Sequence, residues 1–249
     1  MHASHLICDS VAQVERLRQT AASTPGLAHA VSAIKQFQAR RFAGTYHDLL
    51  HAEPYQAAAR FFLDELYSEK DYAERDTQFA RIADGLARFF PKEVTQTAIS
   101  LAQLHLLTET LDLAMARHWL NNADASANPH DLTRYINAWR AVDRREDRDT
   151  QLAKVLALGH ELDHLTRTPG LRFMLKMMRG PANLARLGAL QRFLEAGFDT
   201  FAAMARQAGG PAYFFETVQS RETHLFKLLF EADLVACETE MARTLAQSR

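Results

Sequence analysis

Residues 92–120 read KEVTQTAISLAQLHLLTETLDLAMARHWL. The apolar side chains in this stretch recur every three or four residues, which is the spacing of an α-helix and not the alternation of a strand. They cover nearly the whole circumference of the helix: Ile99, Leu101, Ala102, Leu104, Leu106, Leu107, Leu111, Leu113 and Met115. A helix that is apolar on most sides normally lies at the centre of a bundle. The stretch therefore predicts an all-α protein built around one central helix.

The rest of the chain has the same spacing, and no alternating Val, Ile and Thr run suggests a strand. Proline follows a capping residue at several candidate helix starts, such as Thr24-Pro25 and Asn128-Pro129, where the first helical turn accepts it. We expect a single helical domain over residues 1–249, with a soft boundary near residues 121–129. It would be a multi-helix bundle of about eight to ten helices, at residues 8–21, 25–43, 54–68, 72–89, 92–120, 130–142, 148–167, 171–178, 182–208 and 212–246.

The composition is that of an ordinary globular protein, with 47% apolar and 24% charged residues. Its 29 basic and 30 acidic residues give a net charge of −1, from which no strong attraction to nucleic acid or to an anionic membrane follows. The two cysteines, Cys8 and Cys237, cannot form a disulfide framework, which fits a reducing compartment. The start of the chain lacks signal-peptide features, and no run of about 18 apolar residues occurs. We therefore expect a soluble cytoplasmic protein.

The pentad His160-Glu161-Leu162-Asp163-His164 is the one stretch whose spacing could by itself specify chemistry. Residues four apart share one face of a helix, so both imidazoles could bind one Zn²⁺ ion. Glu161 would then be the catalytic general base toward a metal-bound water. Catalytic zinc needs a third protein ligand, and Glu195 is the best downstream carboxylate. His160, His164 and Glu195 would be the metal ligands of a zinc-dependent hydrolase that resembles the gluzincin metalloproteases.

Three features weigh against this interpretation. Helical geometry places Leu158, Leu162 and Leu165 opposite the two histidines, so the imidazoles could simply be solvated. Asp163 is charged where zincins usually have an uncharged residue. No strand is predicted that could hold an extended substrate. A second histidine pair, in residues 47–51, could add imidazoles if the fold brings the two pairs together.

Two other metal sites can be weighed from the sequence. His105 lies in the most apolar helix, and as a proximal haem ligand it would make the chain a globin-like sensor. The haem pocket would be lined by Phe61, Phe62, Phe89 and Phe90. A core histidine bonded to a neighbour is the commoner role. A ferritin-like di-iron centre requires two Glu-x-x-His turns, and only Glu161–His164 qualifies.

Other motifs indicate structure more than chemistry. The adjacent charges Arg75-Asp76 and Arg221-Glu222 are expected to form local helix pairs or ties between helices. The chain contains neither Gly-x-Ser-x-Gly nor a Gly-rich phosphate-binding loop, so nucleotide-dependent chemistry has no support.

The segment Phe61-Phe62-Leu63-Asp64-Glu65-Leu66-Tyr67, followed by Asp71-Tyr72, Arg75-Asp76, Phe79 and Phe90-Pro91, resembles a pattern in uncharacterised all-helical proteins of proteobacteria. Later pieces are similar too, namely Leu190-Gln191-x-Phe193-Leu194-Glu195-x-Gly197-Phe198 and Arg221-Glu222. The resemblance covers most of the chain from about residue 45 onward. It implies a single helical domain of unknown role, with no established activity and no functional residue to transfer.

We expect a non-catalytic binding or interaction protein without a cofactor. It would recognise a protein or a small apolar ligand in an apolar groove between helices, with aromatic anchors and charged residues at the rim. Neither nucleic acid nor a membrane is an expected partner. The zinc hydrolase is the alternative and the haem sensor the third hypothesis. A homodimer could form through the expected final helix, which carries Phe214, Phe215, Val218, Leu225, Leu228, Leu229 and Leu234.

Overall fold

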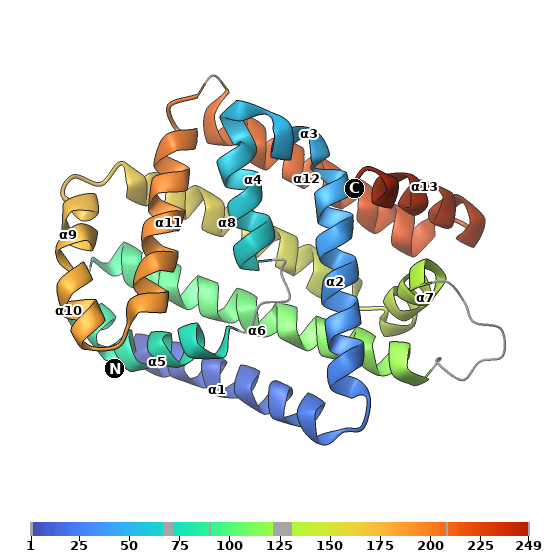
Figure 1. The fold of residues 1–249 in the computed structure, drawn as a ribbon, viewed down its shortest axis with the longest axis horizontal. Helices are drawn as coiled ribbons and strands as arrows, with labels where there is room; N and C mark the ends of the chain where they lie inside the picture. Colours follow the sequence, from blue (N-terminus) through green and yellow to red (C-terminus); the bar gives the residue numbers. More distant parts are fainter. Residues whose placement is uncertain (1, 67–71, 90, 122–130, 208, 249) are drawn as a thin grey trace.

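The computed structural model describes residues 2–66, 72–89, 91–121, 131–207 and 209–248, and over these residues it is all-α, with no strand (Figure 1). The expected fold class is confirmed. The described residues form thirteen helices, slightly more than the predicted eight to ten: α1 (His2–Ser23), α2 (Leu27–Thr45), α3 (His47–His51), α4 (Glu53–Leu66), α5 (Ala73–Phe89), α6 (Lys92–Asn121), α7 (Asp131–Val142), α8 (Arg145–Thr166), α9 (Leu171–Met177), α10 (Arg179–Leu184), α11 (Gly188–Met204), α12 (Gly210–Glu231) and α13 (Leu234–Ala246).

The extra helices are α3, α10 and α13, and local breaks explain the last two. Ala232 and Asp233 have extended backbones, and the Asp233 carboxylate accepts a hydrogen bond from the Ala236 N–H at 2.9 Å. This N-cap starts a new helix, so the single helix predicted over 212–246 was wrong. Arg186 has a φ of 56°, which an α-helix cannot contain. The helix predicted over 182–208 is therefore divided into the end of α10 and α11.

Helix α6 is the central element, as its sequence predicts. It packs against α1, α2, α5, α7 and α8 and runs through the middle of the bundle in Figure 1. Side chains are buried on several of its sides, for example Leu104, Leu111 and Met115. One apolar cluster includes Trp119 before and Tyr135 after residues 122–130. The expected soft boundary at 121–129 lies almost wholly outside the described residues.

The helices at the two ends of the bundle surround different parts of the core. Figure 1 shows α9 and α10 at one end and α7 and α13 at the other. Near α7 and α13, the core also includes side chains of α2, α6 and α12. A second cluster joins α2, α3, α4, α6, α8, α11 and α12, and a third joins α1, α5, α6 and α11. None of the described helices has the length and apolar character needed to cross a membrane.

The apolar side chains proposed for a dimer interface are largely occupied within the chain itself. On α12, most of them lie in its own core, with exposed fractions of 0–7% for Phe214, Phe215, Val218, Leu225 and Leu229. Leu234, the first residue of α13, is 36% exposed.

Candidate functional site

An apolar cavity of about 580 Å³ lies among helices α4, α5, α6, α8, α9, α10 and α11. Its size is within the usual range of small-molecule sites, roughly 300–1,000 Å³. Nearly all of its wall is apolar. Six aromatic rings line it: Phe61, Phe62, Phe79, Phe193, Phe198 and Phe201.

Helix α11 supplies one wall of the cavity. Leu187, immediately before the helix, and Leu190, Leu194, Phe198 and Phe201 all line the cavity, because residues three, four and seven apart share one face of a helix. On the opposite wall, α8 contributes Leu158, Gly159, Leu162 and Leu165. The apolar periodicity of two helices distant in sequence thus creates a common apolar space.

The short helices α9 and α10 cover the cavity at the end of the bundle. Their backbones follow one another almost without interruption, since Met178 donates to the Met174 carbonyl and Ala182 to the Met178 carbonyl. The residues that line the cavity fall on one face of this helical segment, namely Leu171, Met174, Leu175, Met178 and Ala182. The unbranched side chains of Met174 and Met178 can adapt to ligands of different shape.

Polar bonds attach this cover to α11. Gln191 Nε2 donates to the Leu175 carbonyl at 2.7 Å and to Glu195 Oε1 at 2.8 Å. Arg179 of α10 forms a bidentate pair with Glu195, with both N···O distances at 2.7 Å. The hydrogen bonds from Arg179 hold the pKa of the Glu195 carboxyl below its usual value. Glu195 is therefore a carboxylate that ties α10 to α11.

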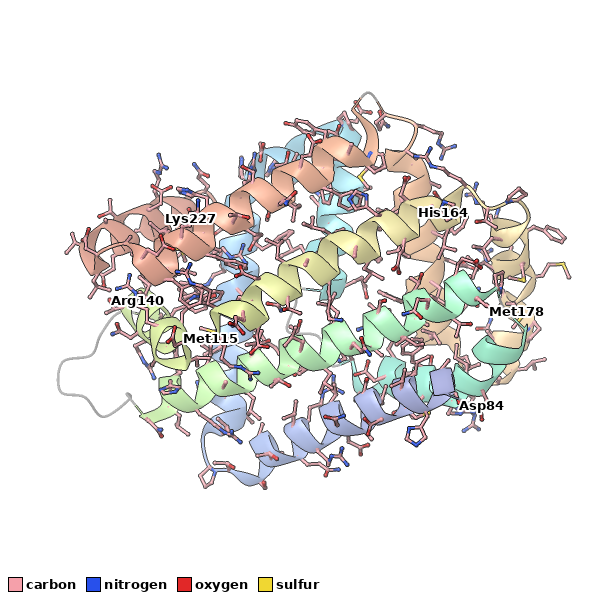
Figure 2. The ribbon with its side chains drawn as sticks, turned by 180° about the vertical axis from the view of Figure 1, so that it is seen from behind. Asp84, Met115, Arg140, His164, Met178 and Lys227 are labelled. Atoms are coloured by element: carbon pink, nitrogen blue, oxygen red, sulfur yellow. The ribbon has the colours of Figure 1, made fainter. Side chains whose placement is uncertain are left out.

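The structure places the predicted zinc ligands at two different locations. His160 and His164 are exposed and line an open hollow between α6 and α8, and His164 is labelled near the end of α8 in Figure 2. Glu161 also lines the hollow, and its buried Oε2 lacks a hydrogen-bond partner in the described part of the chain. Glu195 does not line it. Among the described residues, no three His, Cys, Asp or Glu side chains gather as a metal site.

The other histidines considered as metal ligands, His47, His51 and His105, lie close to other groups of the protein. The rings of His47 and His51 lie 4.2 Å apart, and His51 Nδ1 is 2.7 Å from the His47 carbonyl oxygen. His105 Nε2 lies 3.0 Å from Asp76 Oδ2. Phe61 and Phe62 line the apolar cavity, but His105 does not. Phe90 and the side chain of Phe89 lie outside what the structure describes, as do Tyr67 and Asp71 of the resemblance.

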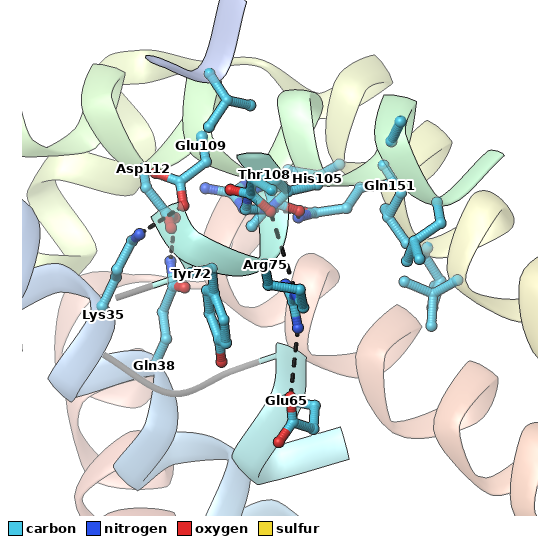
Figure 3. Close-up of a pocket in the computed structure, with 18 of the residues that line it drawn as sticks. Lys35, Gln38, Glu65, Tyr72, Arg75, His105, Thr108, Glu109, Asp112 and Gln151 are labelled. Atoms are coloured by element: carbon cyan, nitrogen blue, oxygen red, sulfur yellow. Dashed lines mark hydrogen bonds and ion pairs between the residues drawn. The ribbon is translucent and has the colours of Figure 1, made fainter. Parts of the chain in front are cut away.

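A second, smaller pocket of about 100 Å³ is lined by buried charges (Figure 3). Arg18 binds Asp76 at 2.8 Å, and Lys35 binds Glu109 at 2.7 Å. Gln38 Nε2 donates to Asp112 at 3.0 Å. These bonds join α1, α2, α5 and α6 in the interior.

The ionisation of this pocket is set by burial and by opposite charges. Burial raises the pKa of the Asp112 carboxyl above its ordinary value. Burial acts in the same direction on Asp76, but the hydrogen bond and charge of His105, with the charges of Arg18 and Arg75, lower its pKa overall. Burial lowers the pKa of the Arg75 guanidinium, which lies over the Tyr72 and Phe193 rings at 4.1 and 4.6 Å.

The adjacent charges Arg75-Asp76 and Arg221-Glu222 include side chains that join helices through other partners. Arg75 pairs with Glu65 at 3.3 Å, and Arg221 pairs with Asp48 at 2.6 Å. Glu222 accepts bonds from Arg41 at 2.5 Å and from Tyr46 at 2.8 Å. The four contacts join α4 to α5, α3 to α12, and α2 with its C-cap Tyr46 to α12.

Sequence reasoning did not identify the polar pocket or the covering role of α9 and α10. One signal for the pocket is present in the sequence. His105, Glu109 and Asp112 are polar residues at spacings of four and three in the most apolar helix, so they share a face that must be buried. The two cavities share a wall, formed by Phe79, Leu101, Leu104, Val155, Leu190 and Phe193.

A family model described as "Domain of unknown function (DUF8198)" matches residues 17–235. No curated protein and no solved structure matches the chain.

Proposed function

This chain belongs to the DUF8198 family, and from that starting point we propose that it binds an apolar small molecule or hydrocarbon chain in the cavity between α8 and α11. The observation that carries the proposal is the space of about 580 Å³ within an apolar wall. Protein interiors are packed about as densely as organic crystals, and voids larger than a water molecule are few. A space of this size is well suited to a ligand.

The chemistry of the wall indicates the chemistry of the ligand. The donors of Thr97, Thr166 and Gln191 are already bonded to the backbone carbonyls of Glu93, Asp163 and Leu175. Arg81, a charged side chain that also lines the cavity, is exposed and donates to the Ala185 carbonyl at 3.1 Å. They offer little to a polar ligand, so the enclosed part of the ligand should be apolar. Its burial would contribute about 25 cal/mol for each Å² of apolar surface removed from water.

Filling the cavity provides a direct experiment. Gly85 of α5 lines the cavity, and a Cβ built there meets nothing within 4 Å. The variant Gly85→Phe should occupy the space with its ring. We expect fluorescence titration with Nile red, an uncharged apolar dye, to show at least about tenfold weaker binding, equivalent to about 1.4 kcal/mol.

The matched control is Asp84→Phe, which adds the same ring at the neighbouring exposed position. This control should bind the dye as the parent protein does. Equal dye binding by Gly85→Phe and the parent, with helical content unchanged by circular dichroism, would contradict binding in this cavity.

Two other hypotheses have direct tests. A zinc hydrolase is supported only by the shared hollow of His160, Glu161 and His164 and by the unpartnered Glu161 oxygen. A zinc content of about one ion per chain in the purified protein, and its loss in the His160→Ala variant, would favour the hydrolase. A haem sensor would give a Soret band on haem titration that is lost in His105→Ala.

A further inference from the structure

The outer face of α9 and α10 carries apolar side chains in solvent. Phe173 is 68% exposed, Met177 62% and Leu184 90%. Their spacings of four and seven place them on one stripe of the nearly continuous helical segment. The opposite face of the same segment lines the cavity. A helix that is apolar on two faces normally has a second apolar surface to cover it.

Basic side chains accompany this stripe. Arg172, Lys176 and Arg179 form a second stripe, one residue before the apolar one and therefore about 100° around the helix. From Arg167 to Leu194 the chain has six basic residues and no acidic residue. Two of the cations are paired with acids of α11, Arg172 with Asp199 and Arg179 with Glu195.

The remaining charge of the segment is positive. Lys176 and Arg186 are exposed and have no ion-pair partner within 4 Å in the described part of the chain. Protruding apolar side chains are therefore accompanied by Lys176, a cation without an ion pair, and Arg186 follows two residues after the end of α10. This is the composition of a helix that lies in the interface of a bilayer, with its apolar side among the acyl chains and its cations at the headgroups.

We propose that the outer face of α9 and α10 docks on the surface of an anionic lipid bilayer. A second copy of the chain is a poorer occupant, because two-fold pairing would bring the same cations against one another. An acidic protein would satisfy the charge, but anchor residues at protein interfaces usually fill preformed pockets. Here the apolar side chains protrude, which suits insertion into a fluid layer.

This proposal concerns a local surface, whereas the expectation of no membrane partner came from the net charge of −1. Charges near a membrane act within about one Debye length, roughly 10 Å. A distant acidic residue therefore does not cancel Lys176 at the bilayer. The end of the bundle that holds α9 and α10 in Figure 1, where Met178 is labelled in Figure 2, would face the lipid.

Docking there would also place the cover of the cavity against the acyl chains. The ligand class would then be a lipid acyl chain taken from the bilayer, a consequence that rests on the proposed function. The docking itself does not depend on it, because the stripe and the cations are on the outside.

Vesicle flotation tests the docking. The parent protein should float with vesicles of equal phosphatidylglycerol and phosphatidylcholine, and at least about tenfold less with phosphatidylcholine alone or at about 0.5 M salt. Leu184→Asp and Phe173→Asp should each reduce flotation at least about tenfold, and Lys176→Glu severalfold. Val235→Asp is the matched control: Val235 is 71% exposed on α13, at the other end of the bundle, and its replacement should leave flotation unchanged.

The proposal is overturned if the parent protein does not bind the anionic vesicles, or if Val235→Asp weakens binding as much as Leu184→Asp. A dimer in sedimentation velocity that Leu184→Asp dissociates, without vesicle binding by the parent, would assign the face to self-association instead. Gly85→Phe separates the two proposals. It should float like the parent protein while losing the apolar dye, and Leu184→Asp should do the reverse.

Discussion

Asp76 and Asp112 line the same polar pocket, but their surroundings move the pKa of the two carboxyls in opposite directions. Asp76 accepts from Arg18 and lies beside His105, so its ionised form is favoured in the folded protein. Gln38 donates a hydrogen bond to the Asp112 carboxylate, but burial has the larger effect and raises the pKa of this carboxyl. A shifted pKa in the folded state makes stability depend on pH.

Replacing Asp76 or Asp112 by asparagine should therefore change the free energy of unfolding with opposite pH dependences. The ionised Asp76 stabilises the fold above the ordinary pKa of 3.8 and loses this effect as pH falls through its lowered folded pKa. Asp76→Asn should destabilise by about 1–3 kcal/mol at neutral pH and by less in acid. Asp112 reduces stability as pH rises from 3.8 through its raised folded pKa, and Asp112→Asn should remove that decrease.

Urea unfolding of both variants and the parent, at several values between about pH 3 and pH 7, measures this difference. Each variant serves as the control for the other, because both replace a buried carboxyl in one pocket. Parallel pH profiles for the two variants would show that the assigned surroundings of these carboxyls are wrong.

Gly159 illustrates how one residue sets the distance between α8 and α12. A Cβ at this position would lie 2.3 Å from Cε1 of Phe215, whose ring is only 2% exposed and cannot easily move. Gly159→Ala should therefore destabilise the protein by about 1–3 kcal/mol, measured by thermal or urea unfolding.

Gly85→Ala is the control for this change, because a Cβ there meets nothing within 4 Å. Alanine in a helix interior is more favourable than glycine by about 0.5–1 kcal/mol, so this variant should gain stability. A loss of stability at position 85 equal to that at position 159 would argue against the close packing of α8 on α12.

At the scale of elements, one side chain determines where the C-terminal helical region divides. Asp233 caps α13 through its bond to the Ala236 N–H, and α13 then packs on α2 and α7. Asp233→Ala should lower the free energy of unfolding by about 0.5–2 kcal/mol, because an N–H of the first turn loses its partner.

Asp233→Asn is the conservative control, since asparagine caps helices about as well as aspartate. It should change the midpoint of urea unfolding little. A loss in Asp233→Asn as large as in Asp233→Ala would mean that charge, and not the capping bond, matters at this position.

For the whole molecule, the sequence predicts what repeats locally and misses what depends on distant partners. The apolar circumference of residues 92–120 correctly predicts the central helix. The cavity beside α11 depends on how distant helices pack, and no local pattern predicts it. The break at Asp233 was missed because a capping aspartate looks like any exposed helical residue until its bond is known.

The candidate site was predicted only in general terms. An apolar groove between helices with aromatic residues was expected, but nothing local distinguishes Phe198 beside a cavity from a phenylalanine in tight packing. Only its position downstream of the histidines makes Glu195 a predicted zinc ligand. Its partner is Arg179, 16 residues earlier in the chain, and only the folding of α10 onto α11 brings the two together.

The proposed binding can be checked by locating an apolar ligand in crystals of the protein soaked with 1-bromododecane. Anomalous diffraction locates the bromine atom independently of the protein atoms. We predict a bromine peak in the cavity, beside Leu171 and Met174 of α9 and Phe198 of α11. Bromine peaks confined to the outer surface, with none within this apolar wall, would contradict the proposed binding function.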